Sequence, residues 1–180
     1  MKKILYNIIL CVFLYSITSC NFITKLKIYY NIKYWQNKSL IIPNNLDVKV
    51  QGKNSYSTLS QFSNYRILNY IDTSTCISCE LKLREWQLLK NEIDSLNIKV
   101  DIVFVVWSQN YDNLEKLQKI NKCIIPCIYD YQNEIALINN FSAQSDFHTF
   151  LLDSFNRVLL IGNPITNKQI RKLYIKKISQ

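Results

Sequence analysis

Residues 66–80 read RILNYIDTSTCISCE, and this stretch decides the fold. Residues 66–72 are rich in the apolar and aromatic types favoured in strands, so they predict a strand. Apolar residues recur with helical spacing from position 80 to position 96, which predicts a helix. The C-x-x-C motif, Cys76-Ile77-Ser78-Cys79, therefore lies between the end of a strand and the start of a helix.

This placement favours thiol chemistry. A thiolate at a helix N-terminus lies near free backbone N–H groups and the positive end of the helix dipole, which lowers the pKa of the thiol. We therefore predict Cys76 as a nucleophile, with Cys79 one helical turn further on as the thiol that resolves a mixed disulfide. The residues beside the two thiols, Thr75, Ile77 and Ser78, are candidate supporting residues, and the polar approach to Cys76 can donate hydrogen bonds to a thiolate.

The rest of the chain alternates strands and helices. A near-continuous apolar run, KVDIVFVVW at 99–107, is typical of a central strand that is covered on both faces. Further predicted elements are a helix marked by Tyr111, Leu114, Leu117 and Ile120, short strands at 127–131 and 135–139, a strand pair at 148–153 and 158–162, and a last helix that begins near Asn167. This order predicts an α/β sandwich around one sheet.

Two of the predicted helices have a recognisable apolar face. In the helix at 80–96 this face comprises Leu81, Trp86, Leu88, Leu89, Ile93 and Leu96. In the last helix it comprises Ile170, Leu173, Tyr174 and Ile178. Residues 47–65, in contrast, are polar and irregular, so they predict a linker with at most a short strand.

The N-terminus has the pattern of a targeting segment. Two lysines precede an apolar run at 4–17, and the sequence ITSC ends at Cys20, which resembles the lipobox of a bacterial lipoprotein. The alternative is an uncleaved transmembrane helix, but the run of about 14 apolar residues is shorter than the roughly 20 that a span needs. We predict a signal peptide at 1–19, lipidation of Cys20, a tether and linker at 20–65, and a folded domain at 66–180.

The positive charge lies mainly outside the centre of the chain. The protein has 22 basic and 13 acidic residues, and none of the acidic ones precedes Asp47. Lysines and aromatic residues alternate in the tether, which favours attraction to an anionic membrane surface. A second basic cluster comprises Lys168, Arg171, Lys172, Lys176 and Lys177, in which a solvated helix face is the simpler interpretation than a binding surface.

Composition excludes several other functions. Residues 47–167 carry 11 basic and 13 acidic residues, whereas a nucleic-acid-binding domain would carry a basic stripe. With two glycines the chain has no glycine-rich phosphate loop, and with one histidine it has no multi-histidine zinc site.

From about residue 66 to residue 177 the chain resembles a thioredoxin-fold protein of the TlpA/ResA (redoxin) type. The resemblance rests on strand–CISC–helix, the apolar strand that ends at Trp107, the segment PCIYD at 126–130, FLLD at 150–153 and the closing hairpin and helix. It implies a thioredoxin-like three-layer sandwich with a mixed sheet. It also implies thiol–disulfide exchange on protein substrates, without a metal or other cofactor, by a monomer anchored in the bacterial envelope. The absence of acidic residues directly after Cys20 favours an anchor that faces the periplasm.

The chain departs from the family pattern at two places. The family usually has a cis-proline at the start of the strand that faces the C-x-x-C, and the equivalent position here is Phe147 or His148. An alternative alignment makes Pro126 that proline. The usual tryptophan before the first cysteine is Thr75. His148 would lie near the thiols, where it could tune Cys76 or transfer protons, although a lone histidine is more often structural.

Cys123 and Cys127 form a C-x-x-x-C pair whose state the sequence leaves open. They could form an auxiliary disulfide, or remain two unpaired thiols on the end of a helix and on a strand. They could also join Cys76 and Cys79 in a four-cysteine zinc site, although an oxidising compartment disfavours it.

The favoured hypothesis is a membrane-tethered thiol–disulfide oxidoreductase that uses Cys76 and Cys79, with the direction of electron transfer left open. The alternative is a non-catalytic lipoprotein in which Cys76 and Cys79 form a static disulfide and the fold serves as a binding module.

Overall fold

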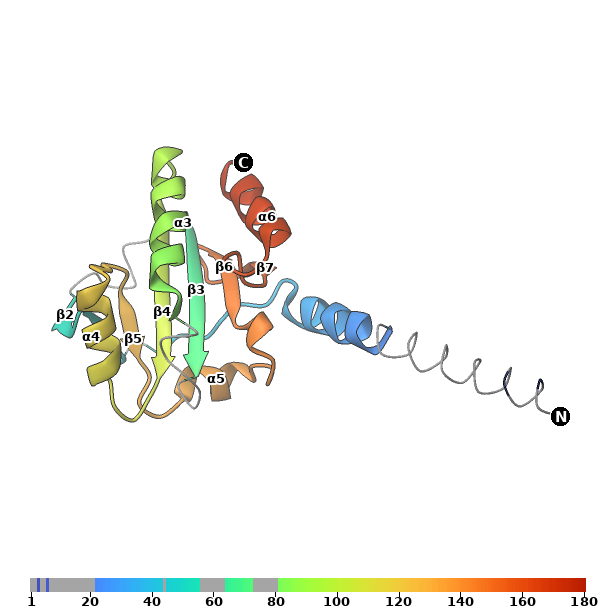
Figure 1. The fold of residues 1–180 in the computed structure, drawn as a ribbon, viewed down its shortest axis with the longest axis horizontal. Helices are drawn as coiled ribbons and strands as arrows, with labels where there is room; N and C mark the ends of the chain where they lie inside the picture. The colour runs from blue at the N-terminus through green and yellow to red at the C-terminus, as the bar shows by residue number, and fades with distance from the viewer. Residues whose placement is uncertain (1–2, 4–5, 7–21, 44, 56–63, 73–80) are drawn as a thin grey trace. The chain divides into compact units, whose positions relative to one another are not determined.

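The computed structural model describes residues 3, 6, 22–43, 45–55, 64–72 and 81–180 (Figure 1). The predicted signal peptide, Cys20 and the CISC motif lie outside the described residues. The chain divides into two compact units, Met1–Trp35 and Gln36–Gln180, which are described separately. In the first unit, residues 22–35 are helical. None of the helices in the described ranges is both long enough and apolar enough to cross a bilayer.

The second unit is built on one mixed sheet of seven strands, in the order β2-β1-β5-β4-β3-β6-β7. The strands are β1 (Asp47–Val50), β2 (Lys53–Asn54), β3 (Tyr65–Asp72), β4 (Val100–Trp107), β5 (Cys127–Tyr129), β6 (Thr149–Asp153) and β7 (Val158–Ile161). The three central strands β3, β4 and β5 run parallel, and the outer pairs are antiparallel.

Strand β4 is central, as the apolar run predicted. It pairs with β3 along its whole length, from Tyr65↔Val100 to Asp72↔Trp107, and with β5 on its other side. Because every backbone group of a central strand can bond to a neighbour, and helices cover the sheet, alternate side chains of β4 are buried on both faces. The predicted hairpin of β6 and β7 is also confirmed.

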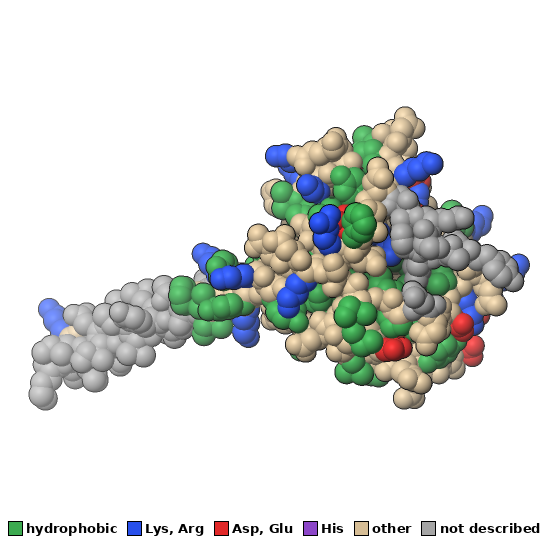
Figure 2. Space-filling model, turned by 180° about the vertical axis from the view of Figure 1, so that it is seen from behind, with side chains coloured by type: hydrophobic (Ala, Val, Ile, Leu, Met, Phe, Trp, Pro, Cys, Tyr) green, Lys and Arg blue, Asp and Glu red, His purple; other side chains and the backbone are tan. Residues whose placement is uncertain are grey.

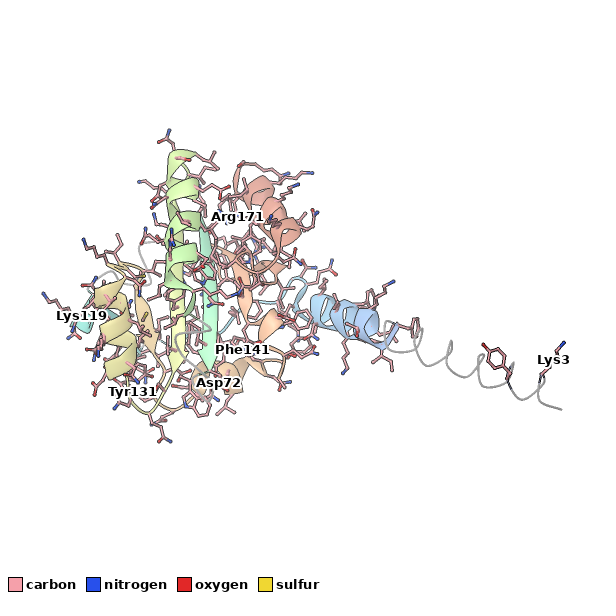
Figure 3. The ribbon with its side chains drawn as sticks, in the orientation of Figure 1. Lys3, Asp72, Lys119, Tyr131, Phe141 and Arg171 are labelled. Carbon is pink, nitrogen blue, oxygen red and sulfur yellow. The ribbon has the colours of Figure 1, made fainter. Side chains whose placement is uncertain are left out.

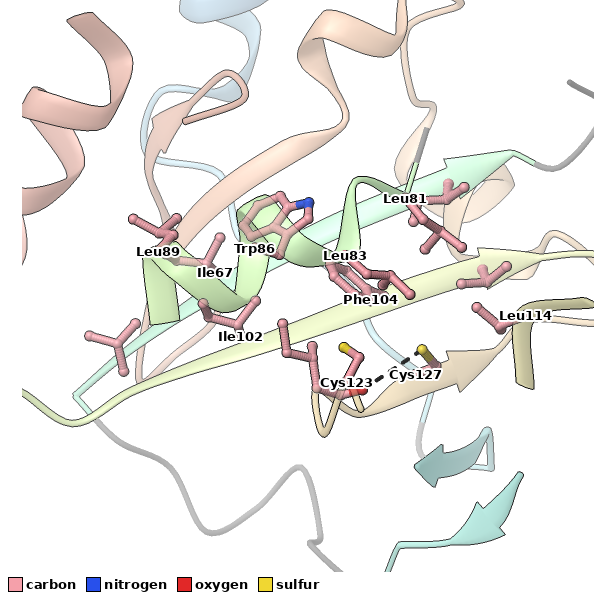
Figure 4. Packing of buried hydrophobic residues seen from close by; sticks show 14 of the residues in the cluster. Ile67, Leu81, Leu83, Trp86, Leu89, Ile102, Phe104, Leu114, Cys123 and Cys127 are labelled. Atoms are coloured by element: carbon pink, nitrogen blue, oxygen red, sulfur yellow. Dashed lines mark hydrogen bonds between the residues drawn. The ribbon is translucent and has the colours of Figure 1, made fainter. Parts of the chain in front are cut away.

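The helices of the second unit complete two outer layers. They are α3 (Leu83–Ser95), α4 (Asp112–Ile120), α5 (Glu134–Asn139), the short 3-10 helix η1 (Ser145–Phe147) and α6 (Lys168–Ile178). On one face, buried residues of α3, α4 and α6 join alternate residues of β4 in one cluster (Figure 4). On the other face, Phe141 contacts both Tyr70 and Phe150, with ring centroids 5.2 Å apart in each pair. The predicted three-layer sandwich is therefore confirmed.

Four residues predicted on apolar helix faces are not buried. Leu88, Leu96, Ile120 and Leu173 are between 44% and 66% exposed. In α3 the buried residues are Leu83, Trp86, Leu89 and Ile93, which form a narrow stripe at spacings of three and four. Leu88 falls outside this stripe, and Leu96 follows the last helical residue.

The strand predicted at 135–139 is wrong, because this segment forms helix α5. The carboxylate of Asp130 accepts hydrogen bonds from the backbone N–H groups of Glu134 (2.7 Å) and Ile135 (2.9 Å). It thus satisfies N–H groups that have no partner within the first turn of a helix. Ile135 and Asn139, four residues apart, are both buried.

The domain begins earlier than the predicted boundary at residue 66. Residues 47–54 of the predicted linker form two strands of the sheet: β1 pairs with β5, and β2 extends the sheet by one more strand. Residues 38–40 also join the fold, because Leu40 N–H donates to Asn156 O (2.9 Å) and Val158 N–H donates to Lys38 O (2.8 Å).

The turn between β6 and β7 depends on one carboxylate. Asp153 accepts hydrogen bonds from the backbone N–H groups of Phe155 (2.8 Å) and Arg157 (2.9 Å) and from the Arg157 guanidinium (2.6 Å). Burial alone would raise the pKa of Asp153, but these hydrogen bonds outweigh it and hold the pKa below its ordinary value. The ionised form of Asp153 is therefore the one that stabilises the hairpin.

Asp153→Asn is expected to lower the free energy of unfolding by about 1 kcal/mol at neutral pH, because an amide replaces a hydrogen-bonded carboxylate. The folded-state pKa lies below the unfolded one, so this stabilisation is present above the unfolded pKa of about 3.9 and is lost as pH falls through the folded pKa. Urea titrations at pH 7 and at pH 3 should show a smaller difference between wild type and variant at pH 3. Asp146→Asn, which removes an exposed carboxylate, is the control; an equal effect from it would contradict the assignment.

Candidate active site

The candidate site lies at the end of the sheet where β3 leads into the CISC segment. Strand β3 ends at Asp72, four residues before Cys76 in the sequence. Figure 3 labels Asp72 at the end of this strand. The roles predicted for Cys76, Cys79, Thr75, Ile77 and Ser78 fall outside the described residues and stay predictions.

The described part of the helix predicted at 80–96 is interrupted at one residue. Leu81 is helical, Lys82 has a left-handed backbone conformation with φ of 37°, and α3 begins at Leu83. The expectation that a helix N-terminus lowers the pKa of Cys76 therefore concerns residues outside the described ranges, and it also stays a prediction.

His148 lies beside β3, directly before the first residue of β6. Tyr70 N–H donates a hydrogen bond to His148 O (2.9 Å), and the paired register of β3 and β6 begins at Asn69↔Thr149. His148 thus contacts β3 two residues before that strand ends. Phe147, the other residue predicted at this position, is half-buried at the end of η1.

The topology contradicts the alternative alignment through Pro126. The residue equivalent to the family's proline must precede the antiparallel strand beside β3, and that strand is β6. Pro126 instead precedes β5, which runs parallel to β4. Position 147 or 148 is therefore the equivalent one, and neither residue is a proline. Within the described ranges no peptide bond is cis.

The His148 ring is held in one orientation. Its Nε2 atom lies 2.6 Å from the carbonyl oxygen of Ser142, which can only accept, so Nε2 carries a hydrogen. The ring also contacts Tyr70 edge-on at 5.1 Å and Phe141 at 5.9 Å. In the neutral imidazole, Nδ1 is then the nitrogen that can accept a proton.

Tyr70 is an anchor for this arrangement and keeps its proton. Its hydroxyl donates to Asn133 Oδ1 at 2.6 Å. Burial, followed by the nearby carboxylates of Asp72 and Asp130, raises the pKa of Tyr70 well above its ordinary value. Tyr70 therefore stays neutral at every physiological pH and does not act as an acid. Its role is to position the His148 ring.

Four segments that are distant in sequence line a pocket of about 200 Å³ at this end of β3. They are the second half of β3, the start of α3, η1 and the loop that follows β7. The lining residues are Asn69, Tyr70, Ile71, Lys82, Trp86, Ser145, Asp146, Asn163 and Thr166. The pocket is mostly polar and carries one lysine, so it suits a backbone or a polar group of a bound chain.

Sequence reasoning did not identify Asn69, Lys82 or Asn163 as site residues. Asn69 is buried and accepts a hydrogen bond from the Thr149 hydroxyl (2.7 Å), which joins β3 to β6 next to the pocket. A polar residue in the middle of an apolar strand was the signal available for Asn69. Lys82 and Asn163 gave no comparable signal, because only the fold brings them together.

Cys123 and Cys127 are free thiols in the core, 1% and 0% exposed (Figure 4). Gln118 Nε2 donates to Cys127 Sγ (3.3 Å) and to Ile125 O (2.9 Å). Burial raises the pKa of both thiols, and for Cys127 the neighbouring Cys123 raises it further. Of the predicted alternatives the structure contains the two unpaired thiols and not the second disulfide. Buried neutral thiols of this kind are chemically inert.

Across the described residues, no group of His, Cys, Asp and Glu side chains could hold a metal ion. The proposed four-cysteine zinc site includes Cys76 and Cys79, which lie outside those residues. Its other two members, Cys123 and Cys127, are buried in the core.

The sequence matches no protein-family model and no curated protein. Solved structures do match the fold. A secreted thiol-disulfide isomerase from Corynebacterium glutamicum aligns with a TM-score of 0.60 and 18% identity, over 77% of this chain and 86% of that one. A putative thiol:disulfide interchange protein, DsbE, from Chlorobium tepidum aligns with a TM-score of 0.57 and 12% identity, over 79% and 99%.

A domain of a possible thiol-disulfide isomerase from Cytophaga hutchinsonii is similar to the same degree, with a TM-score of 0.56 and 14% identity over 79% of this chain and 93% of that one. At such identities the likeness establishes the fold. The chain therefore has a thioredoxin-like α/β fold, with a mixed sheet between layers of helices.

Proposed function

We propose that this protein is a thiol–disulfide oxidoreductase of the bacterial envelope and that Cys76 and Cys79 are its redox-active pair. One observation carries the proposal: in a thioredoxin-like sheet, β3 ends at Asp72, four residues before Cys76 in the sequence, and the strand that pairs with it, β6, begins directly after His148. The solved structures of similar fold are described as thiol–disulfide isomerases or interchange proteins, which supports the same class of reaction.

The reaction would proceed by two exchange steps. The Cys76 thiolate attacks one sulfur of a substrate disulfide, which forms a mixed disulfide and releases the first substrate thiolate. The Cys79 thiolate then attacks the Cys76 sulfur, which forms the Cys76–Cys79 disulfide and releases the second. The substrate gains two electrons and the protein loses two. The reverse sequence oxidises a dithiol, and the reduction potential of the pair decides the direction.

The pocket supports this reaction with charge and with hydrogen-bonding groups. The lining contains one cation, Lys82, and one carboxylate, Asp146; a thiolate would be favoured where Lys82 is the nearer of the two charges. His148 is the candidate proton carrier, with Nδ1 as its accepting atom. The polar lining contributed by Asn69, Asn163 and Ser145 would hold the backbone of a protein substrate.

The proposal includes membrane attachment. Cleavage before Cys20 and its lipidation would anchor the chain to a membrane, facing the periplasm, and place the thiols in a compartment that permits disulfides. The substrate or redox partner would be a protein thiol or disulfide, and the chain would act as a monomer.

One observation favours the alternative of a binding module with a static disulfide. Neither Phe147 nor His148 is the proline that the family uses to shape the substrate groove. The two functions differ in whether the Cys76–Cys79 disulfide opens and closes reversibly.

A redox titration with native alkylation tests the proposal. In a dithiothreitol or glutathione buffer series, the folded protein should show one reversible two-electron couple that involves Cys76 and Cys79. Cys123 and Cys127 should resist alkylation until the chain is unfolded, because they are buried with raised pKa values. A Cys76–Cys79 disulfide that stays closed across the whole buffer range would refute the oxidoreductase and favour the binding module.

A further inference from the structure

The helix at 22–35 exposes a broad apolar surface. Phe22, Leu26, Tyr29 and Tyr30 recur at i, i+4, i+7 and i+8, which places them on one side of the helix. Ile23 and Tyr34 lie at the margin of the same side. These six side chains are between 37% and 63% exposed. In a soluble helix the side with this spacing would be buried against a core.

Lysines accompany this apolar surface, and acidic residues do not. Lys25, Lys27 and Lys33 lie on the helix, and the sequence has no Asp or Glu before position 47. Lys33 Nζ lies 5.8 Å from the centre of the Tyr29 ring, so its charge stays near an aromatic side chain of the apolar side. Figure 2 shows hydrophobic and basic side chains next to one another on this helix.

We propose that the helix at 22–35 lies in the headgroup region of an anionic lipid bilayer and binds it directly, without the lipid at Cys20. Exposed apolar and aromatic side chains on a basic helix are the combination that inserts into a membrane interface. Lysine stems extend along an apolar surface and carry the charge to the phosphates. Charge complementarity favours an anionic bilayer over a neutral one.

The other basic element, α6, lacks half of this combination. Its apolar residues Tyr174 and Ile178 are buried in the core, and Arg171 pairs with Glu92. Lys168, Lys172 and Lys176 are exposed, and Leu173 is the one large apolar residue of α6 that is exposed with them. Helix α6 therefore offers charge without a broad apolar surface, and it provides a matched control.

Vesicle flotation tests the inference. The chain from residue 20 with Cys20→Ser retains the helix at 22–35 and the second unit, and it carries no lipid. At about 0.1 M salt it should float with vesicles of phosphatidylcholine and phosphatidylglycerol at a ratio of about 7:3, and bind phosphatidylcholine vesicles much more weakly. Each lysine near an anionic surface contributes about a fivefold factor, so Lys25→Gln/Lys27→Gln/Lys33→Gln should weaken binding on the order of 100-fold.

The controls separate this helix from net charge. Lys168→Gln/Lys172→Gln/Lys176→Gln removes the same charge from α6 and should change binding by less than about threefold. Leu26→Ser/Tyr30→Ser should abolish the part of the binding that survives high salt. Equal losses from the two lysine variants, or equal binding to neutral and anionic vesicles, would overturn the inference. So would a chain that forms dimers through this helix without binding vesicles.

The inference fails or holds separately from the proposed function. Cys76→Ser should leave vesicle binding unchanged, because it alters neither the charge nor the helix at 22–35. If the chain binds vesicles but performs no thiol exchange, the membrane-binding inference holds and the proposed oxidoreductase function is refuted.

Discussion

Replacing Cys76 with Ser is expected to lower insulin-disulfide reduction by a factor on the order of 1,000 or more. A serine hydroxyl is not ionised at neutral pH and cannot form a mixed disulfide, so the first exchange step is lost. The assay follows insulin precipitation with dithiothreitol as the electron donor, at equal concentrations of folded wild type and variant. Circular dichroism and a urea titration check that both proteins are folded.

Two further variants separate the roles within the pair. Cys79→Ser should also lose turnover, but it should accumulate a mixed disulfide between Cys76 and substrate, because the resolving thiol is absent. Cys123→Ala should retain activity within about threefold, since that thiol is free and buried in the core. Insulin reduction by Cys76→Ser at the wild-type rate would exclude the proposed mechanism.

Replacing Trp86 with Ala is expected to lower the free energy of unfolding by about 3–5 kcal/mol. Trp86 is fully buried on the inner side of α3, and its ring contacts Phe104 of β4 edge-on at 5.5 Å. Removal of the indole leaves a cavity between the helix and the central strand, and it removes an aromatic pair worth about 1 kcal/mol in addition. Because Trp86 also lines the pocket, the same variant should weaken substrate reduction.

Urea titrations followed by far-UV circular dichroism measure this loss. Leu88→Ala is the matched control on the same helix: Leu88 is exposed, so its loss should cost less than about 1 kcal/mol. Trp86→Phe should fall between the two, because an aromatic ring still fills part of the space. A change below about 1 kcal/mol for Trp86→Ala would contradict the packing between α3 and β4.

The central elements were predictable because their patterns are strong. A nine-residue apolar run has few alternatives to a central strand, and β4 occupies eight of its residues. Asn167 accepts hydrogen bonds from the N–H groups of Gln169 and Ile170, so α6 begins where the sequence predicted. The segment at 135–139 is short, and its apolar residues fit either period. Helix α5 depends on hydrogen bonds that the N–H groups of Glu134 and Ile135 donate to Asp130. The periodicity of the sequence does not reveal these hydrogen bonds.

The strands β1 and β2 at one edge of the sheet were not predicted, for a different reason. Strand β1, with the sequence DVKV, alternates polar and apolar residues over only four positions, and β2 has two residues, so both are too short for a local pattern to identify. The candidate site divides similarly. A sequence motif predicts Cys76 and Cys79, and a family pattern predicts position 148. The convergence of Asn69, Lys82 and Asn163 depends on the way distant segments fold together, which no local pattern records.

The segment that joins the domain ahead of its predicted boundary has a consequence for association between molecules. Lys38 and Leu40 form backbone hydrogen bonds at the start of β7, and Ser39 pairs with Arg157. An uncovered edge strand is a template on which a second chain can add a strand. Here one edge is partly occupied by the chain itself, and the other ends in the two-residue strand β2, which carries a lysine. We therefore expect that neighbouring molecules crowded on a membrane surface would not pair their sheets edge to edge.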